Sequence, residues 1–508
     1  MKYARLWLIV MMSVALSAQA CGDDSQGGAT TDAGVTEDDA SDVSSDGHTE
    51  PDANPDADAD ADADASWSCD EFPSAQIAPT TQTEALADDP ARCGQADYRW
   101  IDDSSLGEVT SIGSTEDFPT PLIEGFLSSE GVEPPREVRY DARVVQYEYT
   151  TQDRGQSVLA SSMVAHPVDY DPQDGPLDVL LFLHGTTGFT DACAPSNDFA
   201  YQGLAALMAS FGYFVVAPDY IGLKGTGEET GFLHPYLVGQ STAIASLDAV
   251  RAAANLPAEE RGDVCINPRM VTFGGSQGGH AALWVDRLAP YYAGELDLLG
   301  SVATVPPADM VGQMERAVDE LVDATGNTVA FLGAAAPWYG YGDRLDEVFA
   351  SPLDEDVPEA LGSTCEFSDM IDEPETTADI FTQSLIDEAA NGALAEVDPW
   401  GCITAENGLT STSIERLGPT DDSYGILVVL GEDDELVHTP IEREAFDELC
   451  GQGMPMEFLE CAGAGHGETT FFALPEILDF VDARMAGEVF DQEAPCEHSA
   501  PVQCRGTQ

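Results

Sequence analysis

The fold is decided by the stretch Met270–Gly279, which reads MVTFGGSQGG. Its first four residues predict a buried strand, and a stretch compatible with a helix follows. The glycines around Ser276 complete the pattern G-x-S-x-G, the strand, sharp turn and helix of a nucleophile elbow. A serine hydroxyl is a weak nucleophile, so the turn has to expose it to a base, and glycines two residues before and after it leave room there.

The runs on both sides of this stretch predict a mainly parallel sheet. Unbroken apolar runs indicate strands buried on both faces. Helical stretches alternate with them, which is the order of a doubly wound α/β sheet. The predicted strands are 179–183, 214–217, 270–273, 298–305, 426–430 and 456–459, and the predicted helices are 199–210, 241–254, 279–288, 441–449 and 471–485.

Two segments depart from that alternation. Residues 136–168 alternate with a period of two around a turn at Thr151–Gly155, which predicts an antiparallel hairpin at a sheet edge. Residues 307–422 interrupt the order between two core strands with mixed helical segments and many Asp and Gly. Because this insertion is too long for a pair of connecting helices, we expect it to form a cap.

A catalytic serine needs a general base beside its hydroxyl. His466 lies in the glycine-rich loop Gly463–Gly467, directly after the last predicted strand, where a flexible backbone can bring an imidazole over the sheet edge. His438 is the rival base, because it closely follows the acidic loop described next. We favour His466.

An acid must orient that histidine. Four carboxylates crowd into Gly431–Val437, directly after the strand that ends at Leu430, where open α/β sheets place functional loops. A solvated charge run explains most of them. The spacing Gly-x-x-Asp-x-x-Val favours Asp434 over Asp433 as the orienting acid.

The loop His184–Gly188 follows the strand ending at Leu183, where an oxyanion loop is expected. Its glycines let backbone N–H groups approach a developing negative charge, so the predicted donors are the amides of Thr186 and Gln277. We expect His184 to brace this loop. The chemistry requires no metal and no organic cofactor.

The first 20 residues predict a secretory signal peptide, with two basic residues, the apolar run Leu6–Leu16 and a small-residue site ending at Ala20. Cys21 follows and resembles the lipid-accepting cysteine of bacterial lipoproteins. Ala18 stands where that signal usually has leucine, so ordinary cleavage stays open. We expect a secreted or cell-surface protein, lipid-anchored through Cys21 in a bacterial envelope.

Residues 21–66 predict an acidic disordered tether, because residues 22–66 hold 15 Asp or Glu and no Lys or Arg. The catalytic domain is then 67–508, with the cap at about 307–422. Of the chain's 93 acidic and 19 basic residues, the tether takes 15 acidic ones and the signal two basic ones, which leaves 78 acidic and 17 basic. Such a surface repels nucleic acid, so we expect no nucleic-acid partner. We expect a monomer.

Ten of the eleven cysteines remain when Cys21 is set aside, an even number that can pair fully in an oxidising compartment. Sequence alone leaves many pairings open. Local spacing favours Cys496 with Cys504, Cys365 with Cys402, and Cys450 with Cys461.

The chain resembles the α/β-hydrolase fold and, within it, the secretory lipase family of fungi and bacteria. The resemblance covers about residues 135–487 and also keeps the family's order of serine, acid and histidine. It is carried by the segments 184–188, 193–196, 212–213, 217–220, 233–237 and 274–279 and by the loops of Asp434 and His466. The resemblance implies ester hydrolysis through an acyl-enzyme, with the cap forming much of the acyl-binding tunnel.

We therefore expect a serine carboxylic ester hydrolase that acts on an acyl ester or lipid. Ser276 attacks the acyl carbon, His466 takes the serine proton and later activates water, and Asp434 holds the histidine tautomer. A serine peptidase on the same fold is one alternative, because amide and ester cleavage share the acyl-enzyme route. A noncatalytic surface-binding module is the other.

Overall fold

The computed structural model describes residues 72–77, 93, 100–129, 134–262, 264–365, 371, 374–417, 421–490 and 496–507. The signal peptide, Cys21 and the acidic tether predicted for residues 1–66 lie outside these ranges. Within them, the helices are too short or too polar for any to cross a membrane.

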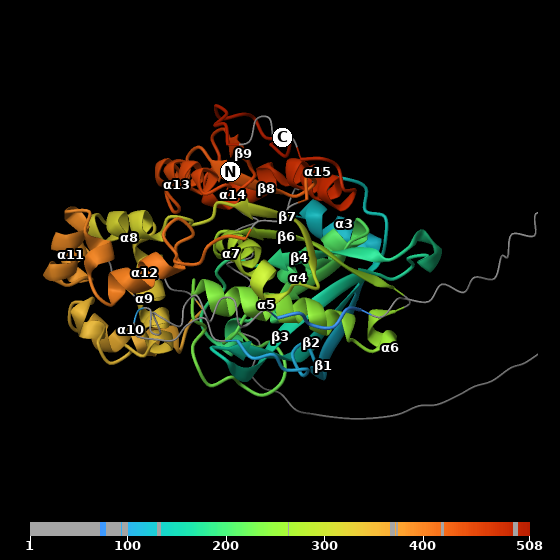
Figure 1. Ribbon diagram of the computed structural model, residues 1–508, viewed down its shortest axis with the longest axis horizontal. Helices are drawn as coiled ribbons and strands as arrows, with labels where there is room; N and C mark the ends of the chain where they lie inside the picture. Colours follow the sequence, from blue (N-terminus) through green and yellow to red (C-terminus); the bar gives the residue numbers. More distant parts are fainter. Residues whose placement is uncertain are drawn as a thin grey trace, which may run out of the picture.

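The described residues form one nine-stranded sheet with the order β1-β2-β3-β5-β4-β6-β7-β8-β9 (Figure 1). The first four strands in this order pair antiparallel, and the strands from β5 to β9 pair parallel. The strands are β1 (Val109–Phe118), β2 (Ala142–Asp153), β3 (Gln156–Pro167), β4 (Leu177–Leu183), β5 (Phe214–Pro218), β6 (Ile266–Gly275), β7 (Asp297–Thr304), β8 (Gly425–Gly431) and β9 (Met456–Cys461).

Two apolar cores lie on the two faces of this sheet, which explains the unbroken apolar runs. In β4, Val179 and Leu181 point to one core and Leu180 points to the other. The first core also holds α5 (Gly239–Ala254), α7 (Gln277–Tyr292) and α13 (Thr439–Gly451). The second holds α3 (Thr120–Ser129), α4 (Phe199–Ser210) and α15 (Leu474–Met485). The short helices α6 (Ala258–Arg261) and α14 (His466–Phe472) complete the connections.

The strand order reverses at β4. The chain passes from β4 through α4 to β5 on one side, and then through α5 to β6 on the other side of β4. The loops that leave the carboxyl ends of β4 and β6 therefore diverge, which opens a crevice where doubly wound sheets bind ligands. The predicted oxyanion loop and the predicted elbow are these two loops.

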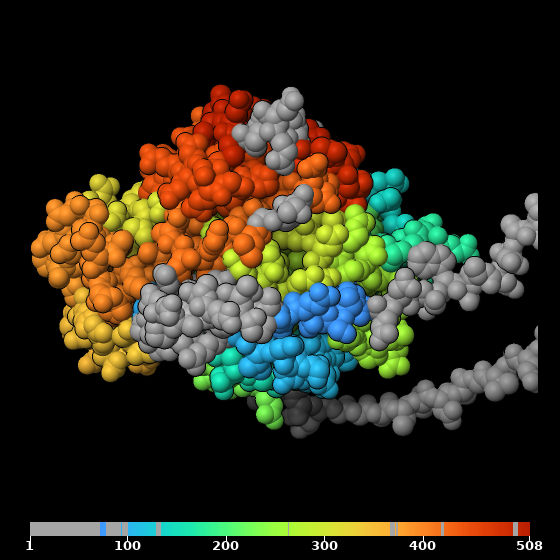
Figure 2. Space-filling view, viewed as in Figure 1, coloured from blue at the N-terminus to red at the C-terminus, as the bar shows by residue number. Residues whose placement is uncertain are grey.

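Among the described residues between β7 and β8, where the sequence predicts a cap, there are five α-helices. They are α8 (Met310–Asp319), α9 (Thr325–Tyr339), α10 (Leu353–Leu361), α11 (Gln383–Ala390) and α12 (Trp400–Asn407). Figure 1 shows them gathered on one side of the sheet, and in Figure 2 their yellow and orange residues form a projecting lobe. They share a third apolar core, which includes Phe331 and Trp400 from these helices and Phe189 and Tyr236 from outside them.

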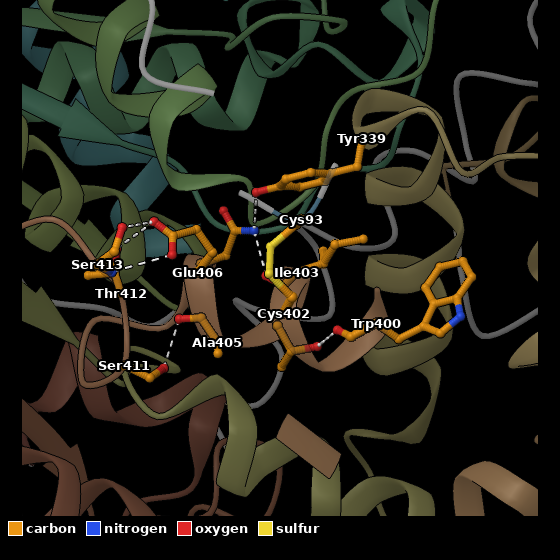
Figure 3. Close-up of a disulfide and its surroundings, with 12 residues drawn as sticks. Cys93, Tyr339, Trp400, Cys402, Ile403, Ala405, Glu406, Ser411, Thr412 and Ser413 are labelled. Atoms are coloured by element: carbon orange, nitrogen blue, oxygen red, sulfur yellow. Dashed lines mark hydrogen bonds between the residues drawn. A yellow bond between two sulfur atoms is a disulfide. The ribbon is translucent and has the colours of Figure 1, made fainter. Parts of the chain in front are cut away.

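The three cysteine pairings predicted from local spacing are wrong. The bonds are Cys93–Cys402, Cys193–Cys365, Cys450–Cys496 and Cys461–Cys504, and Cys265 is disulfide-bonded as well. The C-terminal segment folds back along β9, with Val502 N–H donating to the Glu460 carbonyl at 2.9 Å, so each tail cysteine meets a different partner. Figure 3 shows the bond from Cys402 on α12 to Cys93.

The predicted hairpin is β2 and β3, paired in register from Ala142 opposite Pro167 to Asp153 opposite Gln156. It does not form the sheet edge, because β1 pairs with β2 outside it. The sequence of β1 carries no apolar run, since most of this strand is exposed or half-buried. That is why the periodicity of the sequence does not reveal it.

Candidate active site

Ser276 lies at the turn between β6 and α7, with the backbone angles φ 57° and ψ −119°. A positive φ is strained for a residue with a side chain, and such strain concentrates at functional turns. The Ser276 N–H donates to the Thr304 carbonyl at 2.9 Å, and its carbonyl accepts from the His280 N–H at 3.0 Å. The backbone is thus held on both sides, which presents the side chain at the carboxyl end of the sheet.

The glycines around Ser276 are required by close backbone contacts. A methyl group on Gly274 would overlap the carbonyl of Gly278, and one on Gly278 would overlap the carbonyl of Leu183. On Gly279 it would lie 2.7 Å from the carbonyl oxygen of Thr304. The turn therefore packs against β4 and β7 at separations that only glycine allows.

The loop after β4 lies directly against this turn. A methyl group on Gly185 would lie 3.4 Å from the Gly275 carbonyl oxygen and 3.9 Å from Cβ of Ser276. His184 is buried below the loop, where its ring stacks on Tyr220 at a centroid distance of 4.0 Å. Burial lowers the pKa of His184 to about 3, so the ring is neutral. The buried ring supports the loop from below through this stacking.

Gln277, the residue after the serine, is fixed by a buried histidine for which the sequence suggested no role. Its side-chain amide donates to Nε2 of His234 at 2.7 Å, and Nδ1 of His234 lies 2.8 Å from the carbonyl of Ile221. Burial lowers the pKa of His234 to about 4, so the neutral ring donates from Nδ1 and accepts at Nε2. This pairing orients the first residue of α7.

Thr186 is held by a second contact that the sequence did not indicate. The hydroxyls of Thr186 and Tyr236 lie 2.8 Å apart, and the Asn327 side-chain amide donates to the Tyr236 oxygen at 3.0 Å. Asn327 belongs to α9, so the chain links the loop after β4 to the helices between β7 and β8. The only signal in the sequence for the contact of Tyr236 with Thr186 was the segment Leu233–Leu237, which is one of the segments that carry the family resemblance.

Asp434 is buried at the end of β8, and each of its carboxylate oxygens has partners. Oδ1 accepts from the backbone N–H groups of Leu436 and Val437, both at 3.0 Å. Oδ2 lies 2.8 Å from Nδ1 of His466. The structure therefore brings together the predicted acid and the predicted base. Asp433 is not in this position, because it is exposed.

His466 is the first residue of α14, and this helix meets the turn that carries Ser276. Thr470 lies one helical turn later on the same face of α14. Its hydroxyl oxygen is 2.5 Å from Oγ1 of Thr304. The Thr470 hydroxyl also lies 3.1 Å from where a side chain on Gly275 would begin. His466 thus lies on the face of α14 that packs against the turn.

The other candidate histidines lie elsewhere. The ring of His280 is buried in α7, where Nε2 lies 2.7 Å from the Asn407 carbonyl and burial lowers its pKa to about 4. His438 precedes α13, and its backbone N–H donates to Oε1 of Gln313 at 3.1 Å. Neither ring pairs with the Asp434 carboxylate, whose ring partner is His466.

A pocket of about 60 Å³ lies beside Ser276 and Gln277, and we call it the Ser276 pocket. Leu436 and Val437 of the loop after Asp434 form part of its wall, together with residues before α5 and after β7. Half of its lining comes from α8, α9 and the residue before α9, namely Met310, Gln313, Met314, Ala324, Asn327, Thr328 and Phe331. The walls are mostly apolar.

Comparison with solved structures shows the α/β-hydrolase fold that the sequence predicts. The chain is similar to the rice cell wall degrading esterase LipA from Xanthomonas oryzae, with a TM-score of 0.59, 19% identity, and coverage of 77% of this chain and 100% of that one. It is also similar to Candida antarctica lipase A, with a TM-score of 0.57, 18% identity, and coverage of 78% and 86%.

Comparison with sequences supplies the family. Lipase 6 from Candida albicans is 27% identical over 280 residues, which are 54% of this chain and 56% of that protein, so the chain spans little more than half of that relative. A secreted triacylglycerol lipase, LIP7 from Malassezia globosa, is 23% identical over 67% of this chain and 70% of its own length. The family model described as "Secretory lipase" matches residues 201–492, more than half of the chain. The chain belongs to the secretory lipase family.

Proposed function

We propose that this protein is a secreted carboxylic ester hydrolase that works through an acyl-enzyme. Ser276 attacks the acyl carbon while His466 takes the proton of the serine hydroxyl. The backbone amides of Thr186 and Gln277 donate hydrogen bonds that stabilise the negative charge on the former carbonyl oxygen. His466 then returns the proton to the leaving alcohol. In the second half, His466 removes a proton from water as the water oxygen attacks the acyl carbon, and it returns that proton to Oγ of Ser276 as the acid leaves.

The observation that carries the proposal is the meeting of four loops at one end of the sheet. In this proposal, the loop after β4 supplies the amide of Thr186, the turn after β6 supplies the strained serine and the amide of Gln277, and the loops after β8 and β9 supply the buried acid and the histidine. The 2.8 Å contact between Asp434 and His466 fixes the ring with Nδ1 facing the acid, so in this proposal Nε2 is the nitrogen that takes the serine proton. Such a constellation is what acyl transfer requires.

The helices α8–α12 act in this proposal as a cap, because two of them, α8 and α9, supply half of the lining of the Ser276 pocket together with the residue before α9. An apolar wall beside the nucleophile suits the acyl part of an ester. Family membership and the Malassezia globosa relative support secretion and an acyl ester or lipid substrate. A lipid anchor at Cys21 and a monomeric state stay predictions, and the fungal relatives give the anchor no support.

The test is the turnover of p-nitrophenyl esters by three purified proteins. We expect Ser104→Ala, which removes an exposed hydroxyl, to be as active as the wild type. We expect the turnover of Ser276→Ala to be about 10⁶-fold lower, because this variant lacks the nucleophile. Circular dichroism should not distinguish them. Wild-type turnover by Ser276→Ala would overturn the proposal, and faster cleavage of aminoacyl amides than of esters would make the protein a peptidase.

A further inference from the structure

Two helices each turn one face into the Ser276 pocket. Met310 and Met314 are four residues apart on α8, and Phe331 lies one turn beyond Asn327 and Thr328 on α9. Residues three and four apart share a helix face. Bulky side chains thus line the pocket that also contains the serine, where an acyl chain has to extend.

These walls are held in place by contacts behind them. The Thr404 hydroxyl oxygen, on α12, lies 3.1 Å from the sulfur of Met314 and packs against the end of that side chain. Phe331 is buried in the core of α8–α12. A side chain on Gly333 would begin 2.6 Å from Cγ1 of Val357, so α9 packs closely on α10 and cannot retreat from the pocket without disturbing that core.

The space between these walls limits the acyl group that the pocket can hold. A cavity of about 150 Å³ in a protein core holds one benzene molecule. The Ser276 pocket, at about 60 Å³, is less than half that size. We propose that the protein takes short acyl groups, of about four carbons or fewer, and that Met310, Met314 and Phe331 set this limit. The inference rests on the proposed function and names its substrate class as short-chain esters.

The experiment measures kcat/KM for p-nitrophenyl acetate, butyrate, octanoate and palmitate with one set of proteins. For the wild type we expect the highest values with acetate and butyrate and a fall of at least about tenfold at octanoate, because extra methylenes have no space in a packed wall. Met310→Ala, Met314→Ala and Phe331→Ala each open the pocket. We expect each to raise the ratio of octanoate to butyrate by about tenfold or more.

Met208→Ala is the matched control, because Met208 lies on α4, is buried in the second core of the sheet, and does not line the pocket. It should leave the ratio unchanged. Wild-type activity on octanoate or palmitate that equals activity on butyrate would overturn the inference and leave the proposed function standing. The inference would also be overturned, and the proposed function would stand, if every pocket variant that folds by circular dichroism kept the wild-type ratio of octanoate to butyrate. Inactivity of the wild type on every ester would overturn both.

Discussion

At the scale of single residues, the surroundings separate Asp434 from the acidic residues beside it. Glu432 and Asp433 are exposed, and Glu435 pairs with Arg316 at 2.9 Å on the surface. Asp434 is buried, with two backbone amides on Oδ1 and the His466 ring on Oδ2. The spacing of the sequence favoured this residue. Its amide partners follow from the turn conformation, which spacing does not reveal.

Asp434→Asn is expected to lower kcat by about 10⁴, because the amide cannot hold the required histidine tautomer. Asp433→Asn makes the same change of charge one residue earlier, where the side chain is exposed, and should leave kcat within about twofold of the wild type. Turnover of the p-nitrophenyl ester measures both. Equal losses from the two variants would contradict the assignment of the acid.

Tyr236→Phe is expected to lower kcat by about tenfold with little change in KM, because Thr186 loses the hydroxyl partner that fixes it beside the serine. Steady-state kinetics on a short ester separate the two constants. Tyr341→Phe, on the half-buried turn after α9, is the control and should change neither. A rise in KM with kcat unchanged would mean that Tyr236 only shapes the pocket.

At the scale of elements, α8 is tied to the loop that carries the acid. Gln313 accepts from the His438 N–H at 3.1 Å and donates to Glu442 at 2.8 Å, and Arg316 donates to the Glu435 carbonyl at 2.9 Å. Glu442 also accepts from the Ala308 N–H at 3.0 Å. Burial raises the pKa of Glu442 to about 8. The pocket lies between α8 and this loop.

Glu442 makes stability depend on pH with a defined sign. Its ordinary pKa is 4.5, so between pH 4.5 and about 8 the folded protein holds a proton that the unfolded chain has released. The free energy of unfolding therefore falls as pH rises through this window. We expect the Tm of the wild type to fall relative to that of Glu442→Gln between pH 5 and pH 8.

The readout is the slope of that difference, because glutamine also replaces one acceptor oxygen with a donor and so adds an offset that does not vary with pH. Thermal unfolding followed by circular dichroism at several pH values gives both curves. Parallel curves from pH 5 to pH 8 would contradict the buried, protonated state of Glu442.

Elements with a buried apolar stripe could be predicted from the sequence, and others could not. The parallel strands β4 to β9 contact apolar cores on both faces of the sheet, so apolar runs in the sequence reveal them. β1 is an exposed edge strand, and its pairing with β2 is decided by tertiary packing. The contacts of His234 and Tyr236 join loops far apart in sequence, which no local pattern encodes.

At the scale of the whole molecule, disulfides connect α8–α12 to the rest of the chain. Cys402 on α12 bonds to Cys93, 309 residues away, and Cys365 bonds to Cys193, 172 residues away. Proximity in sequence could not predict these pairs, because folding brings the partners together. Bonds that close such long loops restrict the unfolded chain strongly.

Removing the Cys93–Cys402 bond with the double variant Cys93→Ser and Cys402→Ser is expected to lower the free energy of unfolding by about 2–5 kcal/mol. Denaturant unfolding measures the change, and ester turnover below the transition should persist because neither cysteine touches Ser276. An unchanged unfolding midpoint would contradict a stabilising role for this bond.

The central claim is that Ser276 is the nucleophile of an ester hydrolase, and covalent labelling with a fluorophosphonate tests it most directly. The probe reacts with an activated serine, and peptide mapping by mass spectrometry locates the product. We predict one label per molecule on the peptide that contains Ser276, and no label on Ser276→Ala. A label on another serine, or none on a wild-type protein that hydrolyses esters, would contradict the claim.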